Sequence, residues 1–335
     1  MNDIIVIGGG PAGVTAALRA SELGAQVALV ERGNLGGTCT NDGCVPTRFL
    51  AHAARLVRQA SQFPDHGLVA EKPQLDFGRL MSRTQDKISE INEKKGLTPH
   101  LEDFGVQVFT EVGEASFVNS HTIQTTDGMK LESEKIILCV GGHARRLSFP
   151  GSEHALTHSD VWSLKKLPGS VAIVGGAATG CQLASVLAAF GAKVTLLEIA
   201  PRLLGMEDVV ISDTIAESFN QRGIDVIVDI DGVERIEAGA NEFSLFYNTR
   251  DQTKQVDAEA VILATGWPGN AENLNLKAAG VQSERGYVLV DEYLRTSSEH
   301  IFAAGDITGR MMLVQSAGYE ARIAAENAVL GAGQP

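Results

Sequence analysis

Two cysteines near the start of the chain carry the clearest sign of chemistry. Cys39 and Cys44 are separated by four residues in GGTCTNDGCVPTR, which runs from Gly36 to Arg48. Thiols this close can form a disulfide that accepts two electrons, and the thiolate of one can attack another disulfide. A metal site would need further ligands that the neighbouring sequence lacks. The segment therefore indicates either a redox-active pair or two buried thiols.

A dinucleotide-binding pattern precedes the cysteines. A short apolar strand over 4–7 runs into glycines in GxGxxG spacing, and a helix of small residues is expected over 14–20. The glycines are Gly8, Gly10 and Gly13. They permit a tight turn and let the backbone approach a pyrophosphate, which the helix N-terminus stabilises. The next strand, VALVE, ends at Glu31, where an acid can bond ribose hydroxyls.

The same pattern recurs in VAIVGGAATG, residues 171–180, before a helix and a strand that ends at Glu198. Gly175 and Gly180 fill the first and third fingerprint positions, but Ala177 fills the second. Its methyl group stands where backbone and pyrophosphate should nearly touch, so binding is expected to be shifted or weakened. An acid at Glu198 would repel a 2′-phosphate, which favours NAD(H) over NADP(H).

Two such units, with the cysteine pair after the first, resemble the flavoprotein disulfide reductases. The chain is most similar to the branch of dihydrolipoamide dehydrogenase, mercuric reductase and glutathione reductase, whose cysteine segment reads GGTCxNxGCxPSK. The resemblance covers nearly the whole chain, with further matches in GEASF at Gly113, ILCVGG at Ile137, ILATG at Ile262, VDEYLRTS at Val290 and IFAAGDITG at Ile301. It implies an NAD(P)H-dependent flavoprotein disulfide oxidoreductase with FAD and NAD(H) as cofactors.

The resemblance also implies roles for single residues. Cys44 would be the flavin-side thiol and Cys39 the exchange thiol that faces the substrate. Asp306 would bond the ribityl chain of the flavin, and the helix start at 312–314 would face its ring. The residues expected to bind the two dinucleotides are Gly8, Gly10, Pro11, Ala12, Gly13, Glu31, Arg32, Gly37, Thr38, Ala115, Gly141, Gly175, Gly176, Ala177, Thr179, Gly180, Gln182, Glu198, Gly266, Gly305, Asp306, Met312, Leu313 and Val314.

Three positions depart from the pattern of the relatives. Arg48 replaces a Lys placed near the flavin N5, and Gln182 replaces the Glu that pairs with it. A permanent cation would then meet a neutral amide, which can bond but cannot neutralise it, so Arg48 is a catalytic candidate at which hydride transfer is slower or differently regulated. Trp267 stands where many relatives have Arg, and the sequence assigns it no role.

The end of the chain departs further. The long relatives continue into an interface domain that forms the dimer and supplies a His-Glu pair as general acid and base. That domain is absent from this sequence, which ends at Pro335, and the CxxC of the short thioredoxin reductases is absent as well. A monomer, or a dimer unlike that of the family, is therefore expected.

Composition indicates about two domains in 335 residues. A net charge of -13 opposes binding to nucleic acid or to an anionic membrane. No apolar run reaches the roughly 18 residues of a membrane span, and no basic leader precedes the first strand, so a cytoplasmic location is expected. Four cysteines are too few for a disulfide scaffold, and Cys139 and Cys181 are interpreted as buried packing.

The expected fold is α/β, with two Rossmann-like domains. Residues 1–149 would form the first part of a discontinuous FAD domain, 150–267 the NAD(H) domain, and 268–335 the rest of the FAD domain. Helical periodicity over 51–101 breaks near 63–73 and predicts two helices. Alternation over 106–134 around Asp127-Gly128 predicts a small antiparallel meander. A final helix is expected over 315–330.

Three functions fit these observations. The first is an NADH-dependent reductase that passes electrons through FAD and the cysteine pair to a small or protein-borne disulfide, which includes a lipoyl group or a redox partner protein. The second is a truncated enzyme similar to dihydrolipoamide dehydrogenase. The third is a flavin- and NADH-binding sensor or electron-delivery subunit without thiol turnover.

Overall fold

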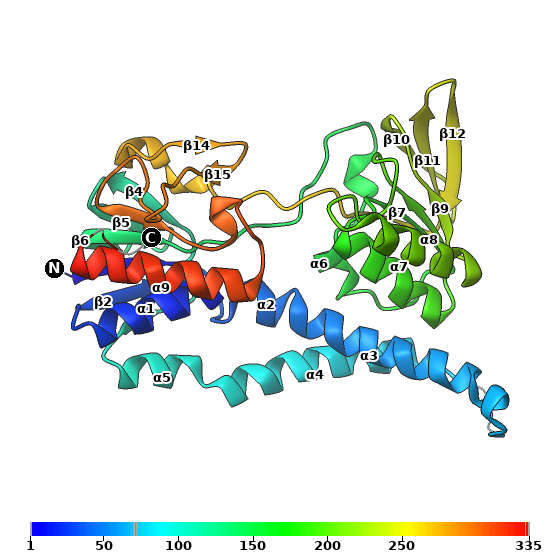
Figure 1. The fold of residues 1–335 in the computed structure, drawn as a ribbon, viewed down its shortest axis with the longest axis horizontal. Coiled ribbons are helices and arrows are strands. Elements are labelled where there is room, and N and C mark those ends of the chain that lie inside the picture. Colours follow the sequence, from blue (N-terminus) through cyan, green and yellow to red (C-terminus); the bar gives the residue numbers. More distant parts are fainter. Residues whose placement is uncertain (1, 70, 72, 332, 334–335) are drawn as a thin grey trace. The chain divides into compact units, whose positions relative to one another are not determined.

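The computed structural model describes residues 2–69, 71, 73–331 and 333. Its chain divides into two compact units. The first contains Met1–Cys44, Ile88–His143 and Trp267–Pro335. The second contains Val45–Lys87 and Ala144–Gly266. Each unit is built around a parallel sheet, and Figure 1 shows the elements of each.

The first unit holds a seven-stranded sheet in the order β3-β2-β1-β6-β5-β4, with β16 paired to β6. Its parallel strands are β1 (Asn2–Ile7), β2 (Val27–Val30), β3 (Gln107–Phe109), β6 (Lys130–Leu138) and β16 (Ile301–Ala303). Continuous apolar runs such as VALV and IIVI are buried, as strands covered on both faces require. Ile5 lies between Ala28 and Ile136 in the register.

A meander extends this sheet. Strand β4 (Ala115–Asn119) pairs antiparallel with β5 (Thr122–Thr125), which pairs antiparallel with the start of β6. The turn between β5 and β6 contains Asp127 and Gly128, the latter at φ 94°. The predicted meander is therefore confirmed. A two-stranded sheet of β14 (Ser283–Glu284) and β15 (Tyr287–Val288) also belongs to this unit.

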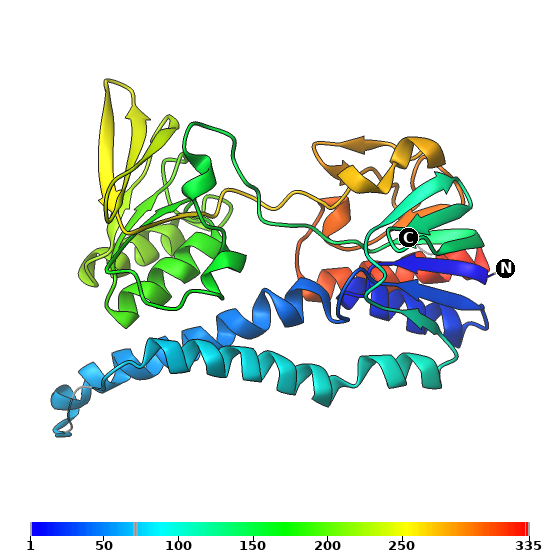
Figure 2. The same cartoon turned by 180° about the vertical axis from the view of Figure 1, so that it is seen from behind.

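Helices α1 (Pro11–Glu22) and α9 (Val314–Leu330) lie side by side in both views of the first unit (Figure 1 and Figure 2). Their contact is made by alanines, including Ala16, Ala20 and Ala321, which are completely buried. The remaining helical segments of this unit are α2 (Gly37–Asn41), the end of α4 (Phe77–Lys95), α5 (Leu97–Asp103) and the 3-10 turns η3 (Glu272–Leu274), η4 (Leu276–Ala279) and η5 (Asp306–Thr308).

The second unit holds a four-stranded parallel sheet in the order β13-β7-β8-β9 and a three-stranded antiparallel sheet, β10-β11-β12. The strands are β7 (Ser170–Val174), β8 (Lys193–Leu197), β9 (Asp225–Ile227), β10 (Gly232–Ala238), β11 (Phe243–Thr249), β12 (Gln252–Ala258) and β13 (Ala260–Leu263). Its helical segments are α3 (Cys44–Ser61), η1 (Phe63–His66), the start of α4, η2 (Ser152–His154), α6 (His158–Val161), α7 (Ala178–Phe190) and α8 (Val209–Gln221).

The α/β fold class and the two strand-helix-strand repeats are confirmed. The helical region between 51 and 101 is also interrupted as predicted, because α3 ends at Ser61, η1 follows it, and α4 begins only at Phe77. The predicted final helix corresponds to α9. None of the helices in the described ranges is long and apolar enough to cross a membrane. Across the same residues, no group of three or more His, Cys, Asp or Glu side chains could hold a metal ion.

Candidate active site

The first fingerprint loop joins β1 to α1, and its three glycines meet different steric requirements. A Cβ on Gly8, which has φ 103°, would lie 2.3 Å from the Cys139 carbonyl oxygen, and one on Gly13 would lie 1.7 Å from that of Gly8. A Cβ on Gly10 would meet only the Cα of Gly37, at 3.7 Å. Packing therefore requires the outer two glycines, whereas the middle one leaves bare backbone for a ligand to approach.

Glu31 follows β2 and lies against this loop. Its carboxylate accepts hydrogen bonds from the backbone N–H of Gly9 at 2.6 Å and of Gly33 at 2.8 Å. Each oxygen keeps a further lone pair that can accept from a hydroxyl group. The acid expected at the ribose is thus held in place by the loop itself.

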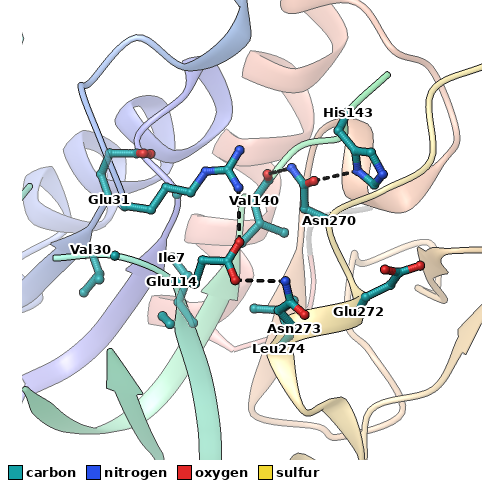
Figure 3. A pocket seen from close by; sticks show the side chains of 14 residues that line it. Ile7, Val30, Glu31, Glu114, Val140, His143, Asn270, Glu272, Asn273 and Leu274 are labelled. Carbon is teal, nitrogen blue, oxygen red and sulfur yellow. Dashed lines mark hydrogen bonds and ion pairs between the residues drawn. The ribbon is translucent and has the colours of Figure 1, made fainter. Parts of the chain in front are cut away.

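A cavity opens beside Gly8 and Glu31, and its empty volume is about 660 Å³ when the solvent at its open mouth is included (Figure 3). Its lining comes from β1, β2, β4, η3 and the loops beside them and after β6: Ile7, Gly8, Val30, Glu31, Arg32, Gly113, Glu114, Ala115, Val140, His143, Asn270, Glu272, Asn273 and Leu274. Four of the predicted dinucleotide residues, Gly8, Glu31, Arg32 and Ala115, are among them.

Hydrogen bonds fix the polar wall of this cavity. Glu114 takes a bond from Asn273 Nδ2 at 2.9 Å and lies 3.4 Å from Arg32 Nη1 (Figure 3). Asn270 donates to the Val140 carbonyl oxygen at 2.7 Å and bonds His143 Nδ1 at 2.8 Å. A cavity that combines apolar side chains with oriented amide and carboxylate groups suits a nucleoside, and its position beside the glycine loop would fit the adenosine end of FAD.

Gly305 brings Asp306 to the start of α1. A Cβ on Gly305, at φ 81°, would lie 3.1 Å from the Cβ of Ala12, and its N–H donates to Glu320 Oε2 at 2.8 Å. Asp306 accepts a hydrogen bond from Trp267 Nε1 at 2.9 Å. Burial raises the pKa of Asp306, and the hydrogen bond from Trp267 acts in the opposite direction. The next predicted contacts, Met312, Leu313 and Val314, are 37 to 56 % exposed.

The cysteine segment packs on the first fingerprint loop. The N–H of Gly36 donates to the Gly9 carbonyl oxygen at 2.8 Å, and a Cβ on Gly37 would lie 2.7 Å from the Cα of Gly10. Cys39 lies half-buried in α2. Gly43 lets the chain return past Thr38, because a Cβ there would be 3.0 Å from the Thr38 carbonyl oxygen.

Cys44 is exposed and begins α3. Pro46 is therefore the third residue of a helix already begun at the cysteine. Its missing N–H costs no hydrogen bond, because the first four N–H groups of a helix have no partner within it. Arg48, the catalytic candidate on the next turn, is exposed and belongs to the second unit.

The other two cysteines are buried, as predicted. Burial raises the pKa of the Cys139 thiol well above its usual range and that of Cys181 to about 11, with Glu198 contributing to the shift of Cys181. Both sulfurs therefore stay protonated at neutral pH. Neither is a nucleophile there, because exchange requires the thiolate.

The second fingerprint loop repeats the first in the other unit. A Cβ on Gly175 would lie 2.4 Å from the Ala264 carbonyl oxygen, and one on Gly180 would lie 1.8 Å from that of Gly175. Ala177 is the N-cap of α7, is exposed, and has φ -79°. Glu198 accepts hydrogen bonds from Gly176 N–H and, at 2.8 Å, from Ala200 N–H.

The predicted residues thus fall into two groups. The first fingerprint loop, Glu31, both cysteines of the segment and Asp306 belong to the first unit. Arg48, Gln182, Gly266 and the second loop with Glu198 belong to the second. Sequence reasoning missed His143, Asn270, Glu272 and Asn273 of the cavity, and gave Trp267 no role. Of these five residues, only Trp267 and Asn270 lie in a distinctive sequence segment, GWPGN, which could have identified them as candidates.

Comparison with known proteins places these features in a family. The family model described as "Pyridine nucleotide-disulphide oxidoreductase" matches residues 2–321. Mercuric reductase of Staphylococcus aureus is 33% identical over 330 residues, which span 98% of this chain and 59% of that protein. Dihydrolipoyl dehydrogenase of Zymomonas mobilis is 34% identical over 337 residues, which span 97% and 70%.

Solved structures give the same result. The HOCl-induced flavoprotein disulfide reductase RclA from Escherichia coli matches with a TM-score of 0.85 and 30% identity. The match covers 99% of this chain and 72% of that one. The chain thus spans between about half and three quarters of the length of these relatives.

Proposed function

The chain belongs to the pyridine nucleotide-disulphide oxidoreductase family, and on that premise we propose that it oxidises NADH and reduces a disulfide through FAD and the Cys39–Cys44 pair. The family depends on FAD and uses pyridine nucleotides. FAD fits the first unit because its glycine loop leaves bare backbone at Gly10 beside an open, polar-walled cavity. When bound there, FAD supplies two-electron transfer between a nicotinamide and a dithiol.

One observation carries the proposal. The helix that bears Cys39 packs directly on the glycine loop that would hold the cofactor, through Gly37 against Gly10. Thiols that served only to fill space would be buried, as Cys139 and Cys181 are, whereas Cys44 is exposed. Position and exposure together favour redox work for this pair.

The proposed reaction transfers two electrons from NADH to a substrate disulfide by way of the cysteine pair. NADH gives up one hydride, which carries two electrons, and becomes NAD+; with one further proton these electrons convert the substrate disulfide into two thiols. Within the protein, the bond between the sulfurs of Cys39 and Cys44 breaks when the pair is reduced. The thiolate of Cys39 then attacks the substrate disulfide, releases one substrate thiol and forms a mixed disulfide. Cys44 attacks the sulfur of Cys39, which releases the second substrate thiol and restores the Cys39–Cys44 bond.

The proposed preference for NADH rests on Glu198, which directly follows β8. Glu198 is held on the second fingerprint loop, where its charge would oppose a 2′-phosphate. Arg202 lies nearby in sequence, but its guanidinium donates to the carbonyl oxygens of Gly205 and Glu207 and to Ser212 Oγ. Its N–H groups are therefore engaged by its own loop and by the start of α8.

Anaerobic titration of the FAD-loaded protein with NADH tests the proposal. We expect a long-wavelength absorbance band from thiolate–flavin contact and a gain of two alkylatable thiols, Cys39 and Cys44, by mass spectrometry. Cys44→Ser should abolish both changes. Cys181→Ser, which removes a buried thiol, should leave both intact, and NADPH should act only at higher concentration than NADH.

Other outcomes would point elsewhere. Bleaching of the flavin with no gain of thiols would favour an NADH-binding sensor or an electron-delivery subunit. Reduction by NADPH at lower concentration than NADH would contradict the proposed coenzyme preference. Once thiol reduction is seen, assays with lipoamide, glutathione disulfide, small disulfides, quinones and mercuric ion would identify the electron acceptor.

A further inference from the structure

Trp267 is built into the site around Asp306. Its indole Nε1 donates to Asp306 Oδ2 at 2.9 Å, across 39 residues of sequence. The indole lies against Gly142, where a Cβ would be 2.5 Å from Nε1 and 2.7 Å from Cδ1. Any larger residue at 142 would therefore displace the ring.

A second aromatic residue fixes the backbone of Trp267. The Tyr287 hydroxyl donates to the Trp267 carbonyl oxygen at 2.8 Å. The ring of Tyr287 covers Gly309, where a Cβ would lie 2.6 Å from its Cγ. Trp267 thus holds the first residue of η5 through Asp306, and Tyr287 packs on the glycine that ends this turn.

The indole N–H is an uncharged donor to the half-buried Asp306 carboxylate, unlike the charged groups of Arg or Lys. It stabilises the ionised form of Asp306 against burial and leaves the negative charge in place. A carboxylate has about four lone-pair sites on two oxygens. One site on Oδ2 takes the indole N–H, which fixes the orientation of the carboxylate and leaves further lone pairs for a ligand.

We propose that Trp267 is a positioning residue that fixes the Asp306 carboxylate to accept a hydroxyl group of the FAD ribityl chain. The inference rests on the proposed function, because it assigns Asp306 to the flavin. Trp267 acts through Asp306 and takes no part in electron transfer.

The first test measures FAD affinity by reconstitution of flavin-free protein. Trp267→Phe keeps an aromatic ring and removes the N–H, so we expect FAD to bind about tenfold more weakly, as for loss of one hydrogen bond to a charged group. Asp306→Ala should also weaken FAD, and the double variant should bind no more weakly than Asp306→Ala alone. Trp162→Phe, at the other tryptophan, should leave FAD affinity unchanged.

The second test uses fluorescence and does not require Trp267 to be changed. Trp162 and Trp267 are the two tryptophans of the chain. In Trp162→Phe all indole emission comes from Trp267, and we expect FAD to quench most of it on binding.

Each alternative outcome has a clear meaning. Unchanged or tighter FAD binding in Trp267→Phe, additive losses in the double variant, or unquenched Trp267 emission would overturn the inference while the proposed function stands. A wild-type protein that binds no FAD would overturn both.

Discussion

The two fingerprint loops differ at the middle position of their glycine pattern, where Ala177 stands in place of the Gly10 of the first loop. Gly10 and Ala177 cap their helices with almost the same backbone, at φ -74° and ψ -174° against φ -79° and ψ -170°. The outer glycines of both loops are required by carbonyl oxygens that a Cβ would strike. At the middle position the backbone of the second loop accommodates a methyl group, so we expect any cost of this methyl group to appear in nucleotide binding.

We therefore expect Ala177→Gly to bind NADH about tenfold more tightly, the order of effect of relieving one overpacked methyl group. The change should cost little stability, since glycine is a good N-cap. NADH fluorescence titration measures the affinity. Ala178→Gly, one residue further into α7, is the matched control and should not tighten binding. Equal or weaker binding of NADH by Ala177→Gly would show that the methyl group does not meet the nucleotide.

Single residues also show where sequence reasoning ends. The glycines could be predicted because a fixed spacing encodes their local geometry, and burial of Cys139 followed from its apolar strand. The hydrogen bond from Trp267 to Asp306 could not be predicted, because the two residues are 39 positions apart and no local sequence pattern encodes their contact. Asn270 and Asn273 reach the cavity in the same way, through tertiary packing.

The short helix α2 depends on a neighbouring element for its position. A five-residue helix has little stability of its own. Two side chains from the end of α4 hold it: Lys95 Nζ donates to Thr40 Oγ1 at 2.7 Å, and Asn92 Nδ2 donates to Asn41 Oδ1 at 2.8 Å. Thr40 is completely buried, and Asn41 donates in turn to the Leu35 carbonyl oxygen at 3.1 Å.

We expect Asn92→Ala and Lys95→Met to loosen α2 by about 1 kcal/mol each, the usual net value of a hydrogen bond. Amide hydrogen exchange over 37–41 should quicken about fivefold, and Cys39 in the reduced protein should be alkylated faster. Lys94→Met changes an exposed lysine on the same turn and is the control. If the amides over 37–41 exchange at the same rate in all three variants, α4 does not hold α2 in place.

Periodicity predicts that the region after the cysteines forms two helices, and the predicted domain bounds place both in the first domain. An amphipathic pattern gives the apolar face of a helix and leaves its partner open. In the structure, Leu50 and Ala54 of α3 and Phe77 of α4 join the core of the second unit, with Phe77 edge-on to Phe190 at 6.4 Å. The end of α4, from Ile88, belongs to the first unit.

At the scale of the whole molecule, each unit has its own hydrophobic core. Leu29 of β2 is completely buried in the core of the first unit, beside Ile4 and Ala17. Leu50 is 3% exposed and shares a core with Ile173 and Leu187 of the second unit. Helix α3, which begins at Cys44 in the first unit, therefore contributes its apolar face to the core of the second unit.

This division predicts which strands a core mutation weakens. Leu50→Ala should cost about 3 kcal/mol, the usual price of removing a buried leucine side chain, and this loss should appear in β7, β8 and α7. Leu29→Ala should cost a similar amount and weaken β1 and β2. Native-state hydrogen exchange resolves the two cases, because amides that open together report one cooperative unit. If Leu50→Ala instead lowered the protection of β1 and β2 as much as that of β7 and β8, the chain would open as one unit, and α3 would not belong to the second core alone.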